Sequence, residues 1–402
     1  MKHILRFSLG VLMLFALVGQ TACDNGDSPY VLERKTFFVY MAADNTLGNG
    51  ADRANLNQML QAYEARYFGL NNRVLIYHTP KNDVPVMLEI TNNRHKNNTQ
   101  TGGSYLGAKI DTLKVYEPQS AADGATLRMA IADMLEFAPA DKYGLVLWSH
   151  GTGWFPAGTS TTYRMERMSL ESVSGEVLSR GRAFGQDGTD WMELADLAGA
   201  IPDRLFDFIL CDACYMGSVE VAYALRNKAT YLLASPAEEE AGGMPYHLIL
   251  DDVFASPTQY ANICREFYTF YKNKDGFATT ALYDLRRMEA LADVMARIVS
   301  AHGATIPSMD IAGLQQYGRF PLGNKVFDMT DFVAKLVPAT DPLLAEYQNV
   351  MASLIRYKAH TDEVFYIPIT SYSGISTYIP LTANTALNAS YAETTWSQRV
   401  YP

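Results

Sequence analysis

Hydrophobic positions along this chain follow two alternating patterns. Short runs of apolar, strand-forming residues are each followed by a longer stretch in which apolar residues return every three or four positions. The runs predict buried strands, and they lie at 36–43, 73–78, 143–148, 206–210, 230–234 and 278–283. Strands that alternate with helices predict an α/β fold, in which helices cover both faces of a mostly parallel sheet.

The stretches with helical spacing predict helices at 56–63, 126–137, 217–225, 255–271, 285–300 and 329–357. Asp190 and Glu193 match a capping box, which predicts the start of one more helix before the strand at 206–210. A hairpin is expected from 87–91 and 108–116, and short strands are expected at 364–369 and 374–380. Residues 152–186 are polar and rich in Gly, Ser and Thr, and a loop of that length in a compact domain is usually functional.

Two of the predicted strands end in reactive side chains. His150 follows the strand at 143–148, and Cys214 lies where the strand at 206–210 gives way to a helix. Because the carboxyl ends of parallel strands open onto the same edge of a sheet, we expect the two side chains to meet there. A histidine beside a cysteine can take the thiol proton and later protonate a leaving amine, while the thiolate attacks a carbonyl. The N–H groups of Gly151 and Cys214 could then stabilise the oxyanion.

Other readings of these residues remain open. Cys211 and Cys214 also form a C-x-x-C pattern, which is found in redox dithiols and in zinc sites. No second C-x-x-C or His pair completes a zinc site, so we interpret Cys211 as a packing residue of the strand. A thiol–disulfide oxidoreductase that uses both cysteines stays an alternative. A non-catalytic surface lipoprotein that binds peptide or glycan through some of its 25 tyrosines is another.

The composition is that of a folded globular protein. The chain has 402 residues, 48% of them hydrophobic, which is enough for one large core and an appendage. The net charge is -10, and no run of five or more like charges occurs. An acidic chain without basic clusters is not expected to bind nucleic acid.

The first 23 residues have the features of an export signal. Lys2 and Arg6 precede an apolar run at 7–18, which is too short to span a bilayer. Cys23 follows, as in bacterial lipoprotein signals, so we expect it to carry lipid and to begin the mature protein; plain secretion is the alternative. Gln20 departs from the branched apolar residue that usually stands three before that cysteine. The mature chain would begin with a polar tether at 24–35, and the remaining three cysteines predict no disulfide framework.

Two motifs together resemble those of the clostripain-like cysteine peptidases, which are related to caspases, legumains and gingipains. They are L-V-L-W-S-H-G-T-G-W at 145–154 and C-D-A-C-Y-M-G at 211–217. The segments V-Y-M-A-A-D-N at 39–45 and G-I-S-T-Y-I-P at 374–380 are also similar to that family. The resemblance spans residues 36–380 and implies a caspase-like sheet.

The resemblance implies roles for residues at the two strand ends. His150 would be the general acid and base and Cys214 the nucleophile, with no third member of a triad. It also implies cleavage after Arg or Lys. Asp212 would hold that basic side chain at the bottom of the S1 pocket, where a carboxylate makes charge-assisted hydrogen bonds. The alternative for Asp212 is to cap the helix that follows Cys214.

The resemblance also implies how the chain is divided and processed. A peptidase core at 36–304 would carry a C-terminal α+β extension at 305–402. Relatives are often zymogens that are cut between the histidine and the cysteine. The loop at about 152–186 has four arginines and no lysine, which suits self-cleavage after Arg. Arg164 and Arg167 are the leading candidate sites.

The expected partners are proteins or peptides with Arg or Lys at the cleavage site. Glu238, Glu239 and Glu240 follow the strand at 230–234, where one of them could help to select basic substrates or all three could be solvated. No cofactor is required by the resemblance, and calcium rests on family analogy alone because the sequence has no EF-hand-like acidic spacing. We expect an exported monomer that contacts a membrane only through its lipid anchor.

Overall fold

Strand β1 (Lys35–Ala42) lies in the middle of the central sheet and is buried along its whole length. Phe37 and Val39 pack into one hydrophobic cluster, whereas Phe38 and Tyr40 pack into another. Successive side chains of a strand point to opposite faces of the sheet, so a strand of apolar residues needs cover on both sides. The sequence of β1 therefore requires a layer of structure on each face.

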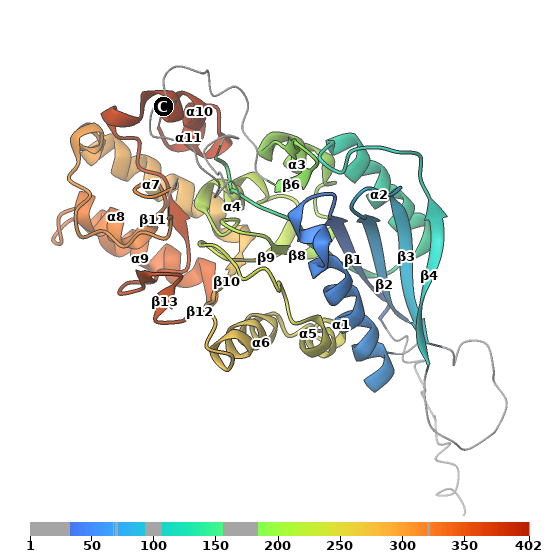
Figure 1. Cartoon of the computed structure of the whole chain (residues 1–402). Helices are drawn as coiled ribbons and strands as arrows, with labels where there is room; N and C mark the ends of the chain where they lie inside the picture. Colours follow the sequence, from blue (N-terminus) through green and yellow to red (C-terminus); the bar gives the residue numbers. More distant parts are fainter. Residues whose placement is uncertain are drawn as a thin grey trace, which may run out of the picture. The chain divides into compact units, whose positions relative to one another are not determined.

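This computed structural model describes residues 33–66, 68, 71–92, 107–155, 184–319 and 322–401. From Glu33 to Pro402 the chain forms one compact unit. The further strands of the central sheet are β2 (Asn72–Thr79), β3 (Val86–Asn92), β4 (Ala108–Val115), β5 (Lys142–Trp148), β8 (Phe206–Asp212), β9 (Ala229–Ala234), β10 (Thr279–Asp284) and β12 (Ile355–His360). Among the described residues these nine strands follow the order β12-β10-β9-β8-β5-β1-β2-β3-β4 (Figure 1).

The middle of this sheet is parallel and its two ends are antiparallel. Strands β2, β1, β5, β8 and β9 run in the same direction. Two antiparallel strands extend the sheet at each end, namely β3 with β4 and β10 with β12. The predicted α/β fold with a mostly parallel sheet is confirmed, and the carboxyl ends of the parallel strands share one edge, where ligands bind in such folds.

Helices cover both faces of the sheet (Figure 1). Those on one face are α1 (Ala51–Ala65), α5 (Tyr246–Phe254) and α6 (Tyr260–Lys272). Those on the other face are α2 (Gly124–Phe137), α3 (Leu194–Ala200), α4 (Val219–Ala224) and α7 (Met288–His302). The two hydrophobic clusters of the core lie between the sheet and these two layers, and they hold the strand ends in fixed positions.

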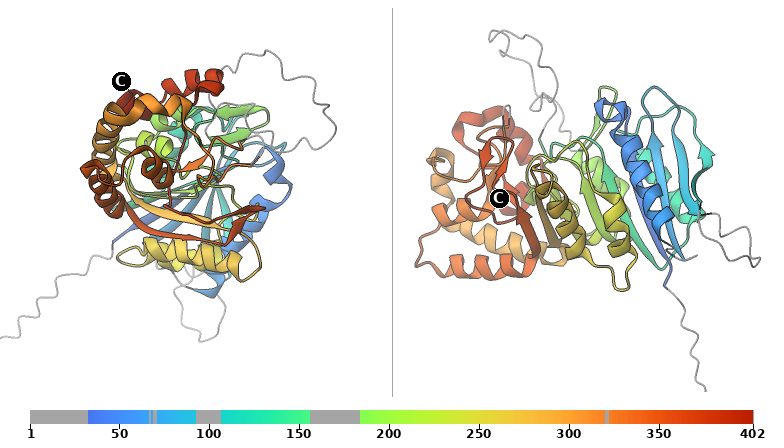
Figure 2. Two further views of the ribbon diagram at one scale, coloured as in Figure 1. Left: turned by 90° about the vertical axis from the view of Figure 1, so that its left-hand side faces the viewer. Right: turned by 60° about the horizontal axis from the view of Figure 1, so that its bottom comes forward.

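The last part of the chain packs against α7 and the β12 end of the sheet (Figure 2). Its helices are α8 (Met329–Leu336), α9 (Pro342–Leu354), α10 (Thr385–Ala392) and α11 (Thr395–Val400). The described residues also form three short strand pairs: β6 (Phe184–Asp187) with β7 (Asp190–Met192), β11 (Phe327–Asp328) with β15 (Ser376–Thr377), and β13 (Glu363–Val364) with β14 (Ile367–Pro368). Residues after position 304 thus supply β12 to the central sheet.

Three predicted elements are wrong in part. Asp190 lies in β7, and α3 starts after Glu193 without a side-chain cap, because residues 184–192 pair as a hairpin instead. The helix predicted at 255–271 starts only at α6, since a proline at 257 keeps the preceding residue out of helical geometry. The helix predicted at 329–357 is two helices followed by the start of β12.

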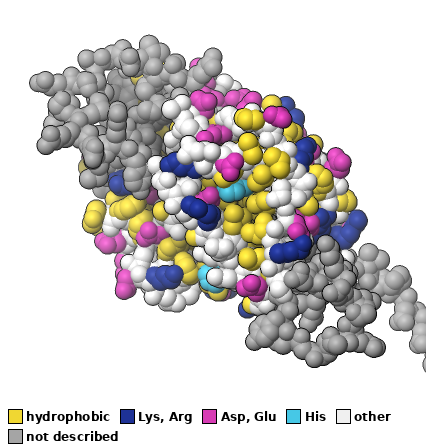
Figure 3. Space-filling view, turned by 45° about the vertical axis from the view of Figure 1, so that its right-hand side comes forward, with side chains coloured by type: hydrophobic (Ala, Val, Ile, Leu, Met, Phe, Trp, Pro, Cys, Tyr) yellow, Lys and Arg dark blue, Asp and Glu magenta, His cyan; other side chains and the backbone are white. Residues whose placement is uncertain are grey.

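None of the helices in the described part of the chain combines the length and the apolar character needed to cross a membrane. On the face seen in Figure 3, acidic and basic side chains are interspersed over the described residues. The negative net charge is therefore not gathered into one patch on this face.

Candidate active site

The candidate site lies where β5 and β8 end. These neighbouring strands run parallel, with Trp148 opposite Asp212. His150 and Cys214 each follow two residues later, so they leave the sheet side by side. Both line one pocket of about 170 Å³, and Asp212 lines it too. The structure therefore brings together three residues that the sequence singled out.

Two glycines allow this close approach. A Cβ atom on Gly151 would lie 2.6 Å from the carbonyl oxygen of Cys214. Gly153 has a φ of 69°, in the left-handed region that favours glycine, and a Cβ atom there would lie 2.8 Å from the carbonyl oxygen of Tyr215. The backbone after His150 is thus packed directly on the backbone around Cys214, and a larger residue at 151 would push the two apart.

The Cys214 thiol faces the segment that follows β9. Its Sγ atom accepts a hydrogen bond from the N–H of Glu239, with 3.3 Å between nitrogen and sulfur. The next residue, Tyr215, has a φ of 62° and donates its N–H to the carbonyl of Ala237 at 2.9 Å. Burial, together with the nearby Glu238 carboxylate, raises the pKa of the Cys214 thiol well above its usual range. The sulfur is therefore a neutral thiol at pH 7, next to an N–H that can stabilise a thiolate.

The surroundings of the His150 imidazole likewise favour its neutral form. Burial lowers its pKa to about 4, because a buried site disfavours the charged imidazolium. Its Nε2 atom lies 2.7 Å from the Oγ1 atom of Thr46. Thr46 belongs to a single 3₁₀ turn, η1 (Thr46–Asn49), that follows β1. Sequence reasoning did not single out Thr46, and no pattern in the sequence indicates this contact.

The N–H groups of Gly151 and Cys214 lie beside each other at the strand ends. A Cβ atom on Gly151 would be 3.3 Å from the nitrogen of Cys214. Neither N–H donates a hydrogen bond to another of the described residues. Two such donors beside a thiol and an imidazole could stabilise a negatively charged oxygen.

Asp212 lines the pocket and is 5% exposed. Its carboxylate accepts hydrogen bonds from the N–H of Met244 at 3.1 Å and from the hydroxyl of Tyr246 at 2.7 Å. Burial nevertheless raises its pKa to about 6. Helix α4 is capped by Ser218, whose Oγ atom accepts the N–H of Val221, so the alternative of Asp212 as a helix cap is wrong.

The three consecutive glutamates after β9 have different environments. Glu238 forms two hydrogen bonds with the guanidinium of Arg319, at 2.7 and 2.9 Å, and accepts a third from the hydroxyl of Tyr215 at 2.8 Å. Glu239 lines the pocket, and its Oε2 atom is buried without a hydrogen-bond partner among the described residues. Burial and the charge of Asp212 raise the pKa of Glu239 well above its usual range. The sequence placed this triplet near the pocket but had no signal that separates its members.

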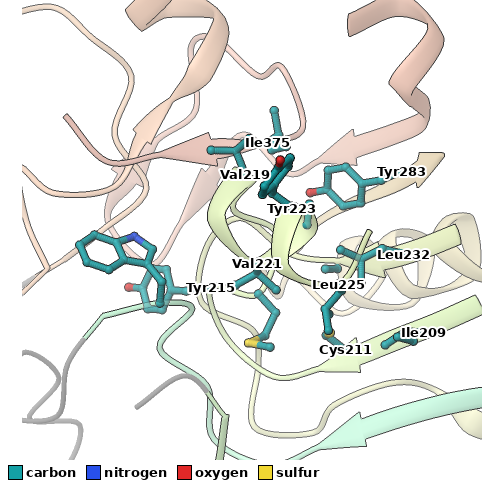
Figure 4. Packing of buried hydrophobic residues seen from close by; sticks show 14 of the residues in the cluster. Ile209, Cys211, Tyr215, Val219, Val221, Tyr223, Leu225, Leu232, Tyr283 and Ile375 are labelled. Atoms are coloured by element: carbon teal, nitrogen blue, oxygen red, sulfur yellow. The ribbon is translucent and has the colours of Figure 1, made fainter. Parts of the chain in front are cut away.

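Cys211 does not face the pocket. Its side chain is 2% exposed and lies in a hydrophobic cluster with Ile209, Val221 and Leu225 (Figure 4). Burial raises the pKa of its thiol well above the usual range. Cys211 is therefore a packing residue of the strand, as the sequence indicated.

No group of three or more His, Cys, Asp or Glu side chains within the described ranges is placed to hold a metal ion. Three residues named from the sequence, Cys23, Arg164 and Arg167, lie outside the described residues.

Comparisons with known proteins agree with the arrangement of the sheet. The family model described as the clostripain family matches residues 39–364. Among solved structures, the chain is similar to an inactive zymogen C11 protease from Parabacteroides distasonis, with 30% identity and a TM-score of 0.75 over 92% of this chain and 99% of that one. It is also similar to a secreted C11 cysteine protease from Bacteroides thetaiotaomicron, with 24% identity and a TM-score of 0.74 over 92% of this chain and 100% of that one. A complex of a secreted C11 protease from the same organism with an irreversible peptide inhibitor has a TM-score of 0.73, at 24% identity over 92% of this chain and 99% of that one. No curated protein matches this chain.

Proposed function

This chain belongs to the clostripain family of cysteine peptidases, and we propose that it cleaves peptide bonds after Arg or Lys with His150 and Cys214 as its catalytic pair. The observation that carries the proposal is the shared pocket, which is lined by the partly exposed His150 imidazole and Cys214 thiol and by the buried Asp212 carboxylate. A basic side chain held by Asp212 would place its own carbonyl group next to the thiol.

The reaction proceeds in two stages. His150 takes the proton from the Cys214 thiol, and the sulfur forms a bond with the carbonyl carbon of the substrate. The N–H groups of Gly151 and Cys214 stabilise the negative oxygen of the tetrahedral intermediate. The imidazolium then gives its proton to the leaving amine, which leaves a thioester. In the second stage His150 activates a water molecule, which hydrolyses the thioester and frees the enzyme.

The neutral resting state shapes the first step. Because the thiol has a raised pKa and the imidazole a lowered one, the pair does not rest as a thiolate and an imidazolium. Proton transfer therefore accompanies attack, with His150 as a general base. The N–H of Glu239, 3.3 Å from the sulfur, stabilises the charge that develops there.

Two acidic side chains support a preference for basic residues. Asp212 and Glu239 line the same pocket, and the charge of Asp212 raises the pKa of Glu239. Two close carboxylates without a cation repel one another, and a guanidinium or ammonium group between them would relieve that repulsion. Glu238 cannot take this role because it already pairs with Arg319.

We extend the proposal to export and activation. The sequence at 1–23 favours export with lipid attached to Cys23, followed by a tether at 24–35. Self-cleavage after Arg164 or Arg167 would convert a zymogen to the active form. The similar structure from Parabacteroides distasonis is that of an inactive zymogen, and a similar resting state in this chain agrees with its neutral catalytic pair.

The test is hydrolysis of fluorogenic peptides that end in Arg, Lys, Asp or Asn, by protein from residue 24 onward. We expect cleavage of the Arg and Lys peptides, with or without prior limited trypsin treatment, and none by a Cys214→Ala variant. A Cys211→Ala variant is the matched control, because an oxidoreductase would need both cysteines and the peptidase needs only Cys214. No hydrolysis of Arg or Lys peptides in either state would overturn the proposal.

A further inference from the structure

The turn after β1 contacts the imidazole of His150. Thr46 Oγ1 lies 2.7 Å from the Nε2 atom of His150. A neutral imidazole has one N–H and one lone pair, and these two positions are set by its hydrogen bonds. With Nε2 engaged by Thr46, Nδ1 is the ring nitrogen that remains for the thiol of Cys214.

The position of Thr46 is fixed by its neighbour. Asn45 donates from Nδ2 to the carbonyls of Ala42 at 2.9 Å and Gln186 at 2.8 Å, and its Oδ1 atom accepts the N–H of Leu47 at 2.8 Å. Ser149, which precedes His150, donates to the same carbonyl of Ala42 at 2.8 Å. The turn and the strand end that carries His150 are therefore tied to one point on β1.

Thr46 itself is exposed, so its side chain contributes little to the packing of the core. A threonine hydroxyl can either donate or accept a hydrogen bond. When it accepts from Nε2–H, the Nδ1 lone pair faces the thiol and can take its proton. The same hydrogen bond persists in the imidazolium, where it is stronger because the donor is charged.

We propose that Thr46 is a positioning residue that holds His150 in the tautomer with its proton on Nε2 and supports the imidazolium formed during catalysis. This inference rests on the proposed role of His150 as general base. Thr46 contacts His150 and is not among the residues that line the pocket, so it would act through the imidazole.

The test compares Thr46→Val, which removes the hydroxyl at nearly constant volume, with Thr46→Ser, which keeps it. Thr385→Val, at an exposed threonine of α10, is the matched control. With an Arg peptide, Thr46→Val should lower kcat about ten- to a hundredfold with little change in KM, the range expected for a hydrogen bond to a charged group. Thr46→Ser and Thr385→Val should stay near wild type.

A pH profile separates positioning from a merely structural role. The titratable and charged side chains that line the pocket around His150 are Asp212, Cys214, Glu238, Glu239, Glu240 and Arg319, and all are unchanged in these variants. Loss of the hydrogen bond disfavours the imidazolium and so lowers the pKa of His150. The acidic limb of the pH–rate profile, which reports this pKa, should therefore move to lower pH in Thr46→Val and not in Thr46→Ser.

A second readout does not depend on activity. In protein with nitrogen-15-labelled histidine, the ring signals of His150 are identified by their loss in His150→Gln. They should show the Nε2–H tautomer in wild type and Thr46→Ser and a mixture of tautomers in Thr46→Val. An unchanged tautomer and an unchanged kcat in Thr46→Val would overturn the inference, while hydrolysis abolished by Cys214→Ala would still support the proposed function. If wild type hydrolyses no peptide, the proposed function fails, and the tautomer alone decides the role of Thr46.

Discussion

Replacing Asp212 by Asn removes a charge from the lining of the pocket and leaves the shape of the side chain almost unchanged. With its amide oxygen in the place of Oδ2, Asn can still accept the hydrogen bonds that Met244 and Tyr246 donate to that atom of Asp212, at 3.1 and 2.7 Å. The variant should therefore fold, and its effect should report the charge alone.

The expected loss of activity follows from the environment of Asp212. A hydrogen bond to a charged group contributes about 1.5–3 kcal/mol, and two charges about 4 Å apart attract by about 4 kcal/mol at an effective dielectric constant of about 20. With Glu239 still in the pocket, we expect a loss of about 2–4 kcal/mol of transition-state binding. At about 1.4 kcal/mol per factor of ten, kcat/KM for Arg peptides should fall roughly 30- to 1,000-fold.

The assay compares an Arg peptide with its citrulline analogue, which has nearly the same shape and no charge. Wild type should strongly prefer Arg, and Asp212→Asn should lose most of that preference. Glu239→Gln should lose less, and the double variant should lose more than either single one. The assignment of Asp212 to the S1 pocket would be refuted if Asp212→Asn preferred Arg over citrulline to within about threefold of the wild-type preference.

The same variant makes an opposite prediction for stability. Burial raises the pKa of Asp212 from its usual 3.8 to about 6. The charged carboxylate is therefore less stable in the folded protein than in the unfolded chain. The resulting loss of free energy of unfolding is absent below pH 4, grows between pH 4 and 6, and is complete above pH 6, where it amounts to about 3 kcal/mol. Urea unfolding should therefore show Asp212→Asn to be more stable than wild type at pH 8 and equal to it near pH 4. Lower stability of the variant at pH 8 would show that the Asp212 charge is stabilised by its surroundings.

Further variants test the rest of the site. Gly151→Ala should lower kcat at least about a hundredfold, because its Cβ atom would meet the Cys214 carbonyl at 2.6 Å; near-normal turnover would mean that the two strand ends can separate without cost. Arg319→Met should lower the free energy of unfolding by about 1–3 kcal/mol, since it leaves the Glu238 carboxylate without its ion pair. The value should lie at the lower end of this range, because the guanidinium is 44% exposed and solvent screens the pair. An unchanged urea midpoint would show that this pair contributes nothing. Cys211→Ala should keep full peptidase activity and lose about 1–2 kcal/mol of stability by creating a small cavity; loss of turnover in a folded protein would favour a role for this thiol in the chemistry.

The sequence by itself was enough to predict the α/β fold and the meeting of two reactive strand ends. Apolar runs such as that of β1 require cover on both faces, and parallel strands must open onto one edge, so the neighbourhood of His150 and Cys214 follows from local pattern and general topology. Element boundaries were less certain where a hairpin interrupts a helical pattern, as around Asp190, or where a proline does, as before α6.

Only the tertiary structure decided which side chains act together at that edge. Glu238 and Glu239 have the same chemistry and adjacent positions, yet one is bound to Arg319 and the other faces Asp212. The contact between Thr46 and His150 joins residues 104 positions apart. Such distinctions depend on the distances between segments that packing brings together. The local order of residue types along the chain does not give those distances.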